Sequence, residues 1–257
     1  MTPLSGRTAL VTGASRTNGI GAAVCRLLAE HGANIVLTHF LAYDRNQYGA
    51  PDDGPERITA DVRSHGVRCE AIACDLSESG AAERLMHDVW ARTGGIDILV
   101  NNAAYSTRDA WDSLTEESLD RHYAVNLRGT AMLTVAFARR FTKGAGGRVI
   151  NFSSGQHLGA MPGELAYASS KGAIIAFTQS IAPDLARLGI TANVINPGPT
   201  DTGWMSDELK AGLIASTPAG RIGQPEDAAR LVGWLASDDA RWITGQVINS
   251  EGGWVRG

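Results

Sequence analysis

The sequence predicts an α/β protein, a doubly wound sheet of seven parallel strands with helices on both faces. Two observations support this fold class. Short, continuously apolar runs recur along the whole chain, as expected of strands buried on both faces of a sheet. Longer segments with the apolar spacing of helices lie between them. Such an alternation folds into right-handed strand–helix–strand units that share one parallel sheet.

Seven runs are predicted as strands, because each is short, apolar and bounded by Gly, Asp or Asn. In chain order they are Thr8–Thr12, Asn34–Thr38, Cys69–Cys74, Asp97–Asn101, Arg148–Phe152, Thr191–Asn196 and Gln246–Asn249. The predicted helices between them are Gly19–His31, Pro55–His65, Ser79–Thr93, Glu116–Phe141, Leu165–Leu188 and Pro225–Ser237. The last helix opens on proline followed by two acidic residues, which is typical of a first helical turn. The chain shows no linker and no repeat, so residues 1–257 are predicted to form one domain.

Two irregular segments interrupt the alternation. Residues 39–54 form a loop insertion after the second strand, and residues 197–221 are rich in Gly, Pro and Thr around a short amphipathic piece. Both leave the carboxyl edge of the sheet, where ligands bind in open α/β folds. We therefore expect residues 197–221 to form a lid over a substrate.

Charge and composition narrow the class of partner. The 23 basic and 27 acidic residues are well mixed and give a net charge of −4, so no basic stripe predicts nucleic-acid binding. No apolar run approaches the roughly 18 residues that span a bilayer, and the first residues lack the pattern of an export signal. The three cysteines have neither disulfide-framework nor metal-ligand spacing. We expect a cytoplasmic protein without a metal, a membrane partner or a nucleic-acid partner.

A glycine-rich loop follows the first predicted strand. In TGASRTNGIG, Gly13 permits a sharp turn, while Gly19 and Gly21 let the backbone approach a pyrophosphate and let the helix pack on the strand. The helix N-terminus then offers free N–H groups to phosphates. In this strand–turn–helix context the loop predicts a Rossmann-type dinucleotide site. Further cofactor contacts are expected from the loop residues Ser15, Arg16, Asn18 and Ile20.

The end of the second strand bears on cofactor choice. NAD-binding sites usually place a carboxylate there to bond the ribose 2′-hydroxyl, whereas this chain has Thr38 and His39. Arg16 can meet a 2′-phosphate and Arg45 can assist, so NADP(H) is favoured. NAD(H) stays open, because Arg16 can equally be a solvated loop charge and Asp44 can fold back onto the ribose.

The segment Tyr167-Ala-Ser-Ser-Lys171 predicts acid–base chemistry. Side chains four residues apart share a helix face. A phenol normally titrates near about 10, and a neighbouring ammonium stabilises the phenolate and lowers that pKa. Tyr167 can then give a proton to a carbonyl oxygen as hydride arrives, or take one from an alcohol.

Together these motifs resemble the short-chain dehydrogenase/reductase family over nearly the whole chain. The loop is similar to the family's TGxxxGxG pattern, with two extra residues between Gly13 and Gly19, and Ser154 completes a Ser-x12-Tyr-x3-Lys pattern. The resemblance implies that Ser154 hydrogen-bonds the substrate oxygen, and that Asn126 holds a water linking the lysine to solvent. The chain is similar in general terms to 3-oxoacyl-(acyl carrier protein) reductases. The resemblance also implies a homotetramer built on paired long helices.

The same resemblance assigns the rest of a cofactor site. Asp75, with Leu76 beside it, is expected at the adenine amine. The NNAA segment is similar to an NNAG motif, which places Asn102, Ala103 and Ala104 at the adenosine ribose. The nicotinamide carboxamide is expected to meet Pro197, Gly198, Thr200 and Thr202. The tail WITGQVI…EGGW is similar to ITGQxIxVDGG, with Glu251 replacing Asp.

The sequence determines the substrate less closely than the cofactor. A mixed, largely apolar pocket is expected from Ser154, Gln156, His157, Met161, Tyr167, Trp204 and Met205. The wide Gly loop resembles that of enoyl reductases, but those relatives place Tyr and Lys seven apart, and residue 174 is Ile174. A carbonyl/alcohol oxidoreductase is therefore favoured. An epimerase, dehydratase, enoyl reductase or imine reductase on this scaffold stays open, whereas a non-catalytic nucleotide-binding protein is disfavoured because both Tyr and Lys are present.

Overall fold

Seven parallel strands form one sheet in the computed structural model, which describes residues 2–49 and 53–254. The order is β3-β2-β1-β4-β5-β6-β7, and each neighbouring pair is parallel. The bounds are β1 (Thr8–Val11), β2 (Asn34–His39), β3 (Cys69–Ala73), β4 (Ile98–Asn101), β5 (Gly147–Phe152), β6 (Ile190–Asn196) and β7 (Val247–Asn249). The predicted fold class is confirmed.

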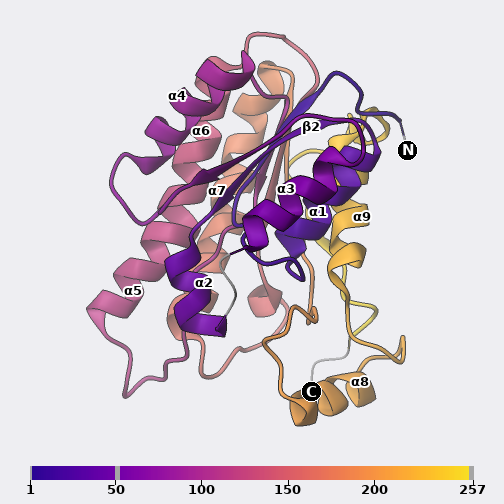
Figure 1. Ribbon diagram of the computed structural model, residues 1–257. Helices are drawn as coiled ribbons and strands as arrows, with labels where there is room; N and C mark the ends of the chain where they lie inside the picture. The colour runs from indigo at the N-terminus through magenta and orange to yellow at the C-terminus, as the bar shows by residue number, and fades with distance from the viewer. Residues whose placement is uncertain (1, 50–52, 255–257) are drawn as a thin grey trace.

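Helices cover both faces of the sheet (Figure 1). On one side lie α1 (Ile20–Glu30), α3 (Gly54–Arg63) and α9 (Pro225–Ala236), and on the other α4 (Ala81–Thr93), α6 (Thr130–Arg140) and α7 (Leu165–Arg187). Strand side chains alternate between two cores. Val11 and Ile35 join the first with α1 and α9, while Leu10 and Val36 join the second with α4 and α6. This two-sided burial explains why the strands read as continuous apolar runs.

The insertion after β2 contains a helix that the sequence did not predict. α2 (Leu41–Tyr48) has no buried residue, so its sequence carries no apolar stripe to mark it. It ends at Gly49, whose left-handed φ of 60° is the usual glycine signature of a helix C-terminus. The prediction of an irregular loop at residues 39–54 is therefore wrong for this part, and residues 50–52 lie outside the described ranges.

The predicted long helix Glu116–Phe141 is also divided. It consists of α5 (Glu116–His122), a π-helical segment η1 (Tyr123–Gly129) and α6. Wider π-helical turns often occur at functional sites. Here the π-helical segment carries Asn126, whose amide is fully buried and hydrogen-bonded to the Tyr105 carbonyl. Periodicity alone does not reveal such a local widening.

The carboxyl ends of β1 and β4 form the point where strand order reverses, because β2 lies on one side of β1 and β4 on the other. Ligands of open α/β sheets bind in this crevice. Two short helices lie at the same edge of the molecule, α2 and α8 (Asp207–Ser216) (Figure 1). Within the described residues, no helix is long and apolar enough to cross a membrane.

Candidate active site

A cavity of about 780 Å³ opens at this carboxyl edge and joins the two predicted halves of the site. One end is lined by the glycine-rich loop and the ends of β2 and β3, through Gly13, Ser15, Arg16, Gly19, Ile20, Thr38, His39, Asp75 and Leu76. The middle and far end are lined by Asn102, Ala103, Ala104, Ser154, Tyr167, Lys171, Pro197, Gly198, Thr200 and Thr202. Residues far apart in the sequence therefore share one hollow.

The glycine-rich loop has the shape and polarity that a dinucleotide pyrophosphate requires. The N-terminus of α1 makes no side-chain cap hydrogen bond and has no acidic residue in its first turn, and Gly19 and Ile20 face the cavity. Its N–H groups and positive dipole end therefore remain available to an anion. Gly13 has φ of 71°, and a Cβ there would lie 2.6 Å from the Cα of Ala103. The loop residues therefore fit a nicotinamide dinucleotide.

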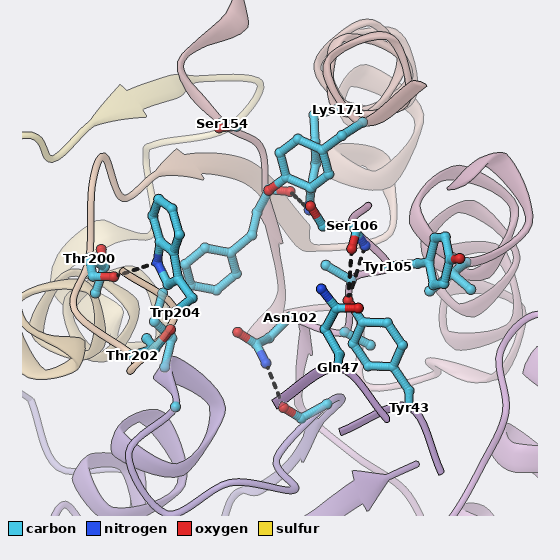
Figure 2. A pocket seen from close by; sticks show the side chains of 18 of the residues that line it. Tyr43, Gln47, Asn102, Tyr105, Ser106, Ser154, Lys171, Thr200, Thr202 and Trp204 are labelled. Carbon is cyan, nitrogen blue, oxygen red and sulfur yellow. Dashed lines mark hydrogen bonds between the residues drawn. The ribbon is translucent and has the colours of Figure 1, made fainter. Parts of the chain in front are cut away.

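Two of the loop residues predicted to contact the cofactor, Asn18 and Gly21, lie outside the cavity lining and serve packing instead. A Cβ on Gly21 would lie 2.8 Å from the Asn102 side-chain nitrogen and from the Gly13 carbonyl oxygen. That same Asn102 nitrogen donates to the carbonyl oxygens of Thr12 and Gly13, at 2.9 and 3.0 Å, and one of these two bonds is drawn in Figure 2. The Asn18 side chain donates to the Thr202 carbonyl. Gly21 and Asn18 thus hold the loop against its neighbours.

Arg16 contacts three groups of the protein. Its Nε lies 3.3 Å from the Asp44 carboxylate, its Nη1 donates to the Thr202 carbonyl at 2.7 Å, and its guanidinium lies 3.9 Å from the centre of the Tyr48 ring. Burial raises the pKa of the Asp44 carboxyl, while a hydrogen bond from Ser15 and the charge of Arg16 oppose this rise. Asp44 therefore folds back onto the glycine-rich loop, from α2 and not from β2.

The catalytic candidates lie at the other end of the cavity, on α7 and after β5. The Lys171 ammonium donates to the Phe152 carbonyl at 2.9 Å and lies 5.6 Å from the centre of the Tyr167 ring. Burial lowers the pKa of Lys171 to about 8. Burial also raises the pKa of Tyr167, with a further contribution from Glu164, while the Ser154 hydrogen bond acts in the opposite direction. The expected lowering of the pKa of the Tyr167 phenol is therefore not found, because burial and the charge of Glu164 raise it and the Ser154 hydrogen bond does not offset them.

Asn126 is brought near these groups but does not line the cavity. Its amide nitrogen donates to the Tyr105 carbonyl and to the Ser170 hydroxyl, at 3.0 and 2.9 Å, and its oxygen accepts from the Tyr105 N–H at 2.8 Å. The side chain thereby fixes the loop that follows β4. Protein groups therefore use three of the four hydrogen-bonding positions of this amide.

The substrate end is only partly as predicted. Met161 and Trp204 line the cavity, and the Trp204 indole donates to the Thr200 carbonyl at 3.0 Å (Figure 2). Gln156, His157 and Met205 do not line it. His157 is exposed, Met205 is buried, and the amide of Gln156 is enclosed without a hydrogen-bond partner among the described residues. These three predicted contacts are not brought to the cavity.

Further residues complete the wall. Asp44, Tyr105 and Glu251 were noted in the sequence, whereas Tyr43, Gln47, Tyr48, Arg121, Glu164 and Trp254 were missed. The cavity is also lined by Tyr43, Asp44, Gln47 and Tyr48 of α2, by Tyr105 and Arg121, and by Glu164, Glu251 and Trp254. A polar, aromatic segment that leaves the carboxyl edge of a sheet is itself a signal for a ligand wall, and YDRNQY is such a segment. No cluster of three or more His, Cys, Asp or Glu side chains suited to a metal occurs in residues 2–49 and 53–254.

Comparison with known proteins agrees with this geometry. A family model described as Enoyl-(Acyl carrier protein) reductase matches residues 13–255. The chain belongs to the short-chain dehydrogenase/reductase family. YjdA of Bacillus subtilis (strain 168), an uncharacterized oxidoreductase, is 50% identical over 251 residues, which cover 97% of each chain. The 3-oxoacyl-(acyl-carrier-protein) reductase FabG of Haemophilus influenzae is 34% identical, and the match covers 97% of this chain and 98% of FabG.

A solved structure extends the likeness of this short-chain dehydrogenase/reductase to three dimensions. A blue fluorescent protein from a metagenomic library, crystallised in complex with NADPH, matches with a TM-score of 0.88 at 31% identity, over 98% of this chain and 99% of that one. The expected family is confirmed, and the chain is an NAD(P)-dependent oxidoreductase.

Proposed function

We propose that this enzyme transfers hydride between NADP(H) and a small carbonyl or secondary-alcohol substrate, as a ketoreductase. One observation carries the proposal. Ser154, Tyr167 and Lys171 line one end of the cavity whose other end is formed by the glycine-rich loop. The name of the FabG relative, a 3-oxoacyl reductase, supports a carbonyl substrate. The four-residue spacing of Tyr167 and Lys171 argues against an enoyl reductase.

Each catalytic side chain has a role in this proposal. The bound nicotinamide supplies hydride in one direction and accepts it in the other. Tyr167 gives its phenol proton to the carbonyl oxygen, and the Ser154 hydroxyl donates a hydrogen bond to the same oxygen as negative charge develops there. A phenol is protonated at neutral pH, and burial of Tyr167 favours that form further, as proton donation in the reductive direction requires. Lys171 places a positive charge beside the resulting phenolate.

The remaining predicted contacts are proposed to bind the cofactor. The loop around Gly13, Gly19 and Ile20 would hold the pyrophosphate, Asp75 and Leu76 the adenine, and Asn102 to Ala104 the ribose. Pro197, Gly198, Thr200 and Thr202 would orient the carboxamide. The NADPH complex of the structural relative supports NADP(H). NAD(H) remains a second candidate, because Asp44 pairs with Arg16 where a 2′-phosphate would bind.

Residues 197–221 are proposed to form the substrate lid. α8 within this segment has no buried residue, so few apolar contacts hold it in place. Leu209 and Leu213 of this helix nevertheless line the cavity. Movement of α8 would therefore change access to the catalytic end without disturbing the core.

A panel of ketones and aldehydes, run with NADPH and NADH side by side and analysed for products, tests the proposal. We expect alcohol products matched one to one by NADPH oxidation. The Arg16→Ala variant should lose roughly tenfold or more in kcat/KM with NADPH, but not with NADH, because charge-assisted hydrogen bonds to the 2′-phosphate are lost.

The Asp44→Asn variant tests the opposite change, because it removes the negative charge beside Arg16. Its cofactor preference should shift toward NADPH. Three outcomes would contradict the proposal: turnover without net NADPH oxidation, reduction of a C=C bond with the carbonyl retained, or unchanged preference in both variants. The first indicates an epimerase or dehydratase, the second an enoyl reductase, and the third a different cofactor contact.

A further inference from the structure

The loop that follows β4 grips the start of the catalytic helix. Asp109 accepts hydrogen bonds from the backbone N–H groups of Leu165 and Ala166, at 2.5 and 3.1 Å. Its own N–H donates to the Gly163 carbonyl at 3.0 Å. The neighbouring Arg108 lies 3.3 Å from the Glu164 carboxylate. Two consecutive residues of the loop thus contact all four residues that precede Tyr167.

Helix α7 needs this contact because its own sequence provides no cap. Glu164 at the N-cap position makes no side-chain cap hydrogen bond, and the first turn contains no acidic residue. Helix starts leave N–H groups without intrahelical partners. The carboxylate of Asp109 satisfies two of them and also meets the positive end of the helix dipole. Asp109 is only 6% exposed, so water cannot readily replace it.

The loop that carries Asp109 is itself held firmly. Asn126 bonds both backbone groups of Tyr105, and the Tyr43 hydroxyl bonds both backbone groups of Ser106 (Figure 2). The Thr107 N–H donates to His122, whose ring also packs edge-on toward Tyr167 with centroids 6.4 Å apart. Asp109 therefore presents its carboxylate from a fixed position.

We propose that Asp109 is a positioning residue for the reaction. It fixes the first turn of α7, and through that turn it sets the place of the Tyr167 hydroxyl relative to Ser154 and the nicotinamide site. The inference rests on the proposed role of Tyr167 as proton donor. Misplacement of reacting groups by about 1 Å can cost about a hundredfold in rate, so a helix start that shifts slightly is enough to matter.

The test compares Asp109→Ala and Asp109→Asn with two controls. Asp97→Asn alters another buried carboxylate, which accepts from the Thr8 N–H at 3.0 Å at the opposite edge of the sheet. Thr115→Ala removes the cap of another helix start, because the Thr115 hydroxyl accepts from the Ser118 N–H at the N-terminus of α5 at 3.1 Å. For each variant one measures kcat, KM, the stoichiometry of NADPH binding, thermal stability, and hydrogen exchange of the peptide covering residues 164–171.

We expect Asp109→Ala to lower kcat about tenfold or more, with NADPH stoichiometry kept and faster exchange at the helix start. Asp109→Asn keeps one acceptor oxygen, so its kcat should lie between those of Asp109→Ala and the wild type. Both controls should keep kcat within about twofold of the wild type. If Asp109→Ala does not fold, Asp109→Asn decides alone.

The proposal is overturned if the Asp109 variants keep the wild-type kcat, or if Asp97→Asn lowers kcat as much as they do. Wild-type protein that reduces no carbonyl at all would instead refute the proposed function. In that case the exchange data still show whether Asp109 holds the start of α7.

Discussion

At the scale of single residues, the structure changes the expected chemistry of the Tyr167–Lys171 pair. The four-residue spacing correctly indicated that both side chains share a helix face and reach one cavity. It did not indicate the directions of their pKa shifts. Burial dominates both groups, raising the pKa of Tyr167 and lowering that of Lys171 to about 8. Sequence spacing carries no information on desolvation, which depends on everything packed around the pair.

This environment predicts an alkaline limit on carbonyl reduction. Tyr167 must be neutral and Lys171 charged, and Lys171 loses its proton first. We therefore expect kcat/KM, which reports the free enzyme, to fall with a midpoint near pH 8. Lys171→Arg, where active, keeps its positive charge and should move this alkaline fall in kcat/KM to higher pH. A wild-type profile that stays flat to pH 10 contradicts the assignment.

The same shift predicts a pH dependence of stability that needs no substrate. Lys171 binds its proton less tightly in the folded chain than at its ordinary pKa of 10.5. Between about pH 8 and 10.5 the unfolded state therefore holds more protons, and the free energy of unfolding should rise with pH. Lys171→Met should lack this rise in denaturant titrations. An equal rise in both proteins would assign it to other groups.

At the scale of elements, α2 forms one wall of the cavity. Tyr43 contacts the rings of Tyr48 and Tyr105, at centroid separations of 6.1 and 5.4 Å. Its hydroxyl accepts from the Ser106 N–H and donates to the Ser106 carbonyl, at 3.1 and 3.3 Å. α2 is thus held to the loop after β4 by one tyrosine, while its own packing is slight.

Removal of this hydroxyl should loosen α2 without unfolding the protein. We expect Tyr43→Phe to speed hydrogen exchange in residues 41–48, and to lower the free energy of unfolding by only about 1 kcal/mol. Tyr105→Phe is the control, since the hydroxyl of Tyr105 makes no hydrogen bond within the described residues. Equal exchange in the wild type and Tyr43→Phe would show that α2 is held by other contacts.

Elements with a buried apolar face were predicted well, and those held by polar contacts were not. All seven strands were found. The inner strands are buried from both sides, and the partly exposed edge strands β3 and β7 still carry short apolar runs. α2 was missed because it buries no residue, and the π-helical segment because one wider turn barely alters the apolar spacing. In the candidate site, local sequence motifs located the glycine-rich loop and the Tyr167–Lys171 pair. Gln156 and His157 were misplaced because the short turn after Ser154 takes them away from the cavity.

At the scale of the whole molecule, the resemblance predicts a homotetramer in the cytoplasm. The chain exposes apolar side chains on the long helices, among them Met132 of α6 and Leu165 of α7, and Trp242 is 95% exposed. Pairing of these surfaces would remove them from water. Light scattering should therefore give four times the chain mass of 27.1 kDa. A monomer at micromolar concentration contradicts the prediction.

The most direct measurement is the rate of NADPH-dependent carbonyl reduction by Tyr167→Phe, made beside a titration of its NADPH affinity. Loss of the phenolic proton donor should lower kcat by at least about a hundredfold, while the affinity for NADPH stays within about twofold of wild type. A variant that binds NADPH normally and still reduces carbonyls at the wild-type rate would show that another group protonates the substrate.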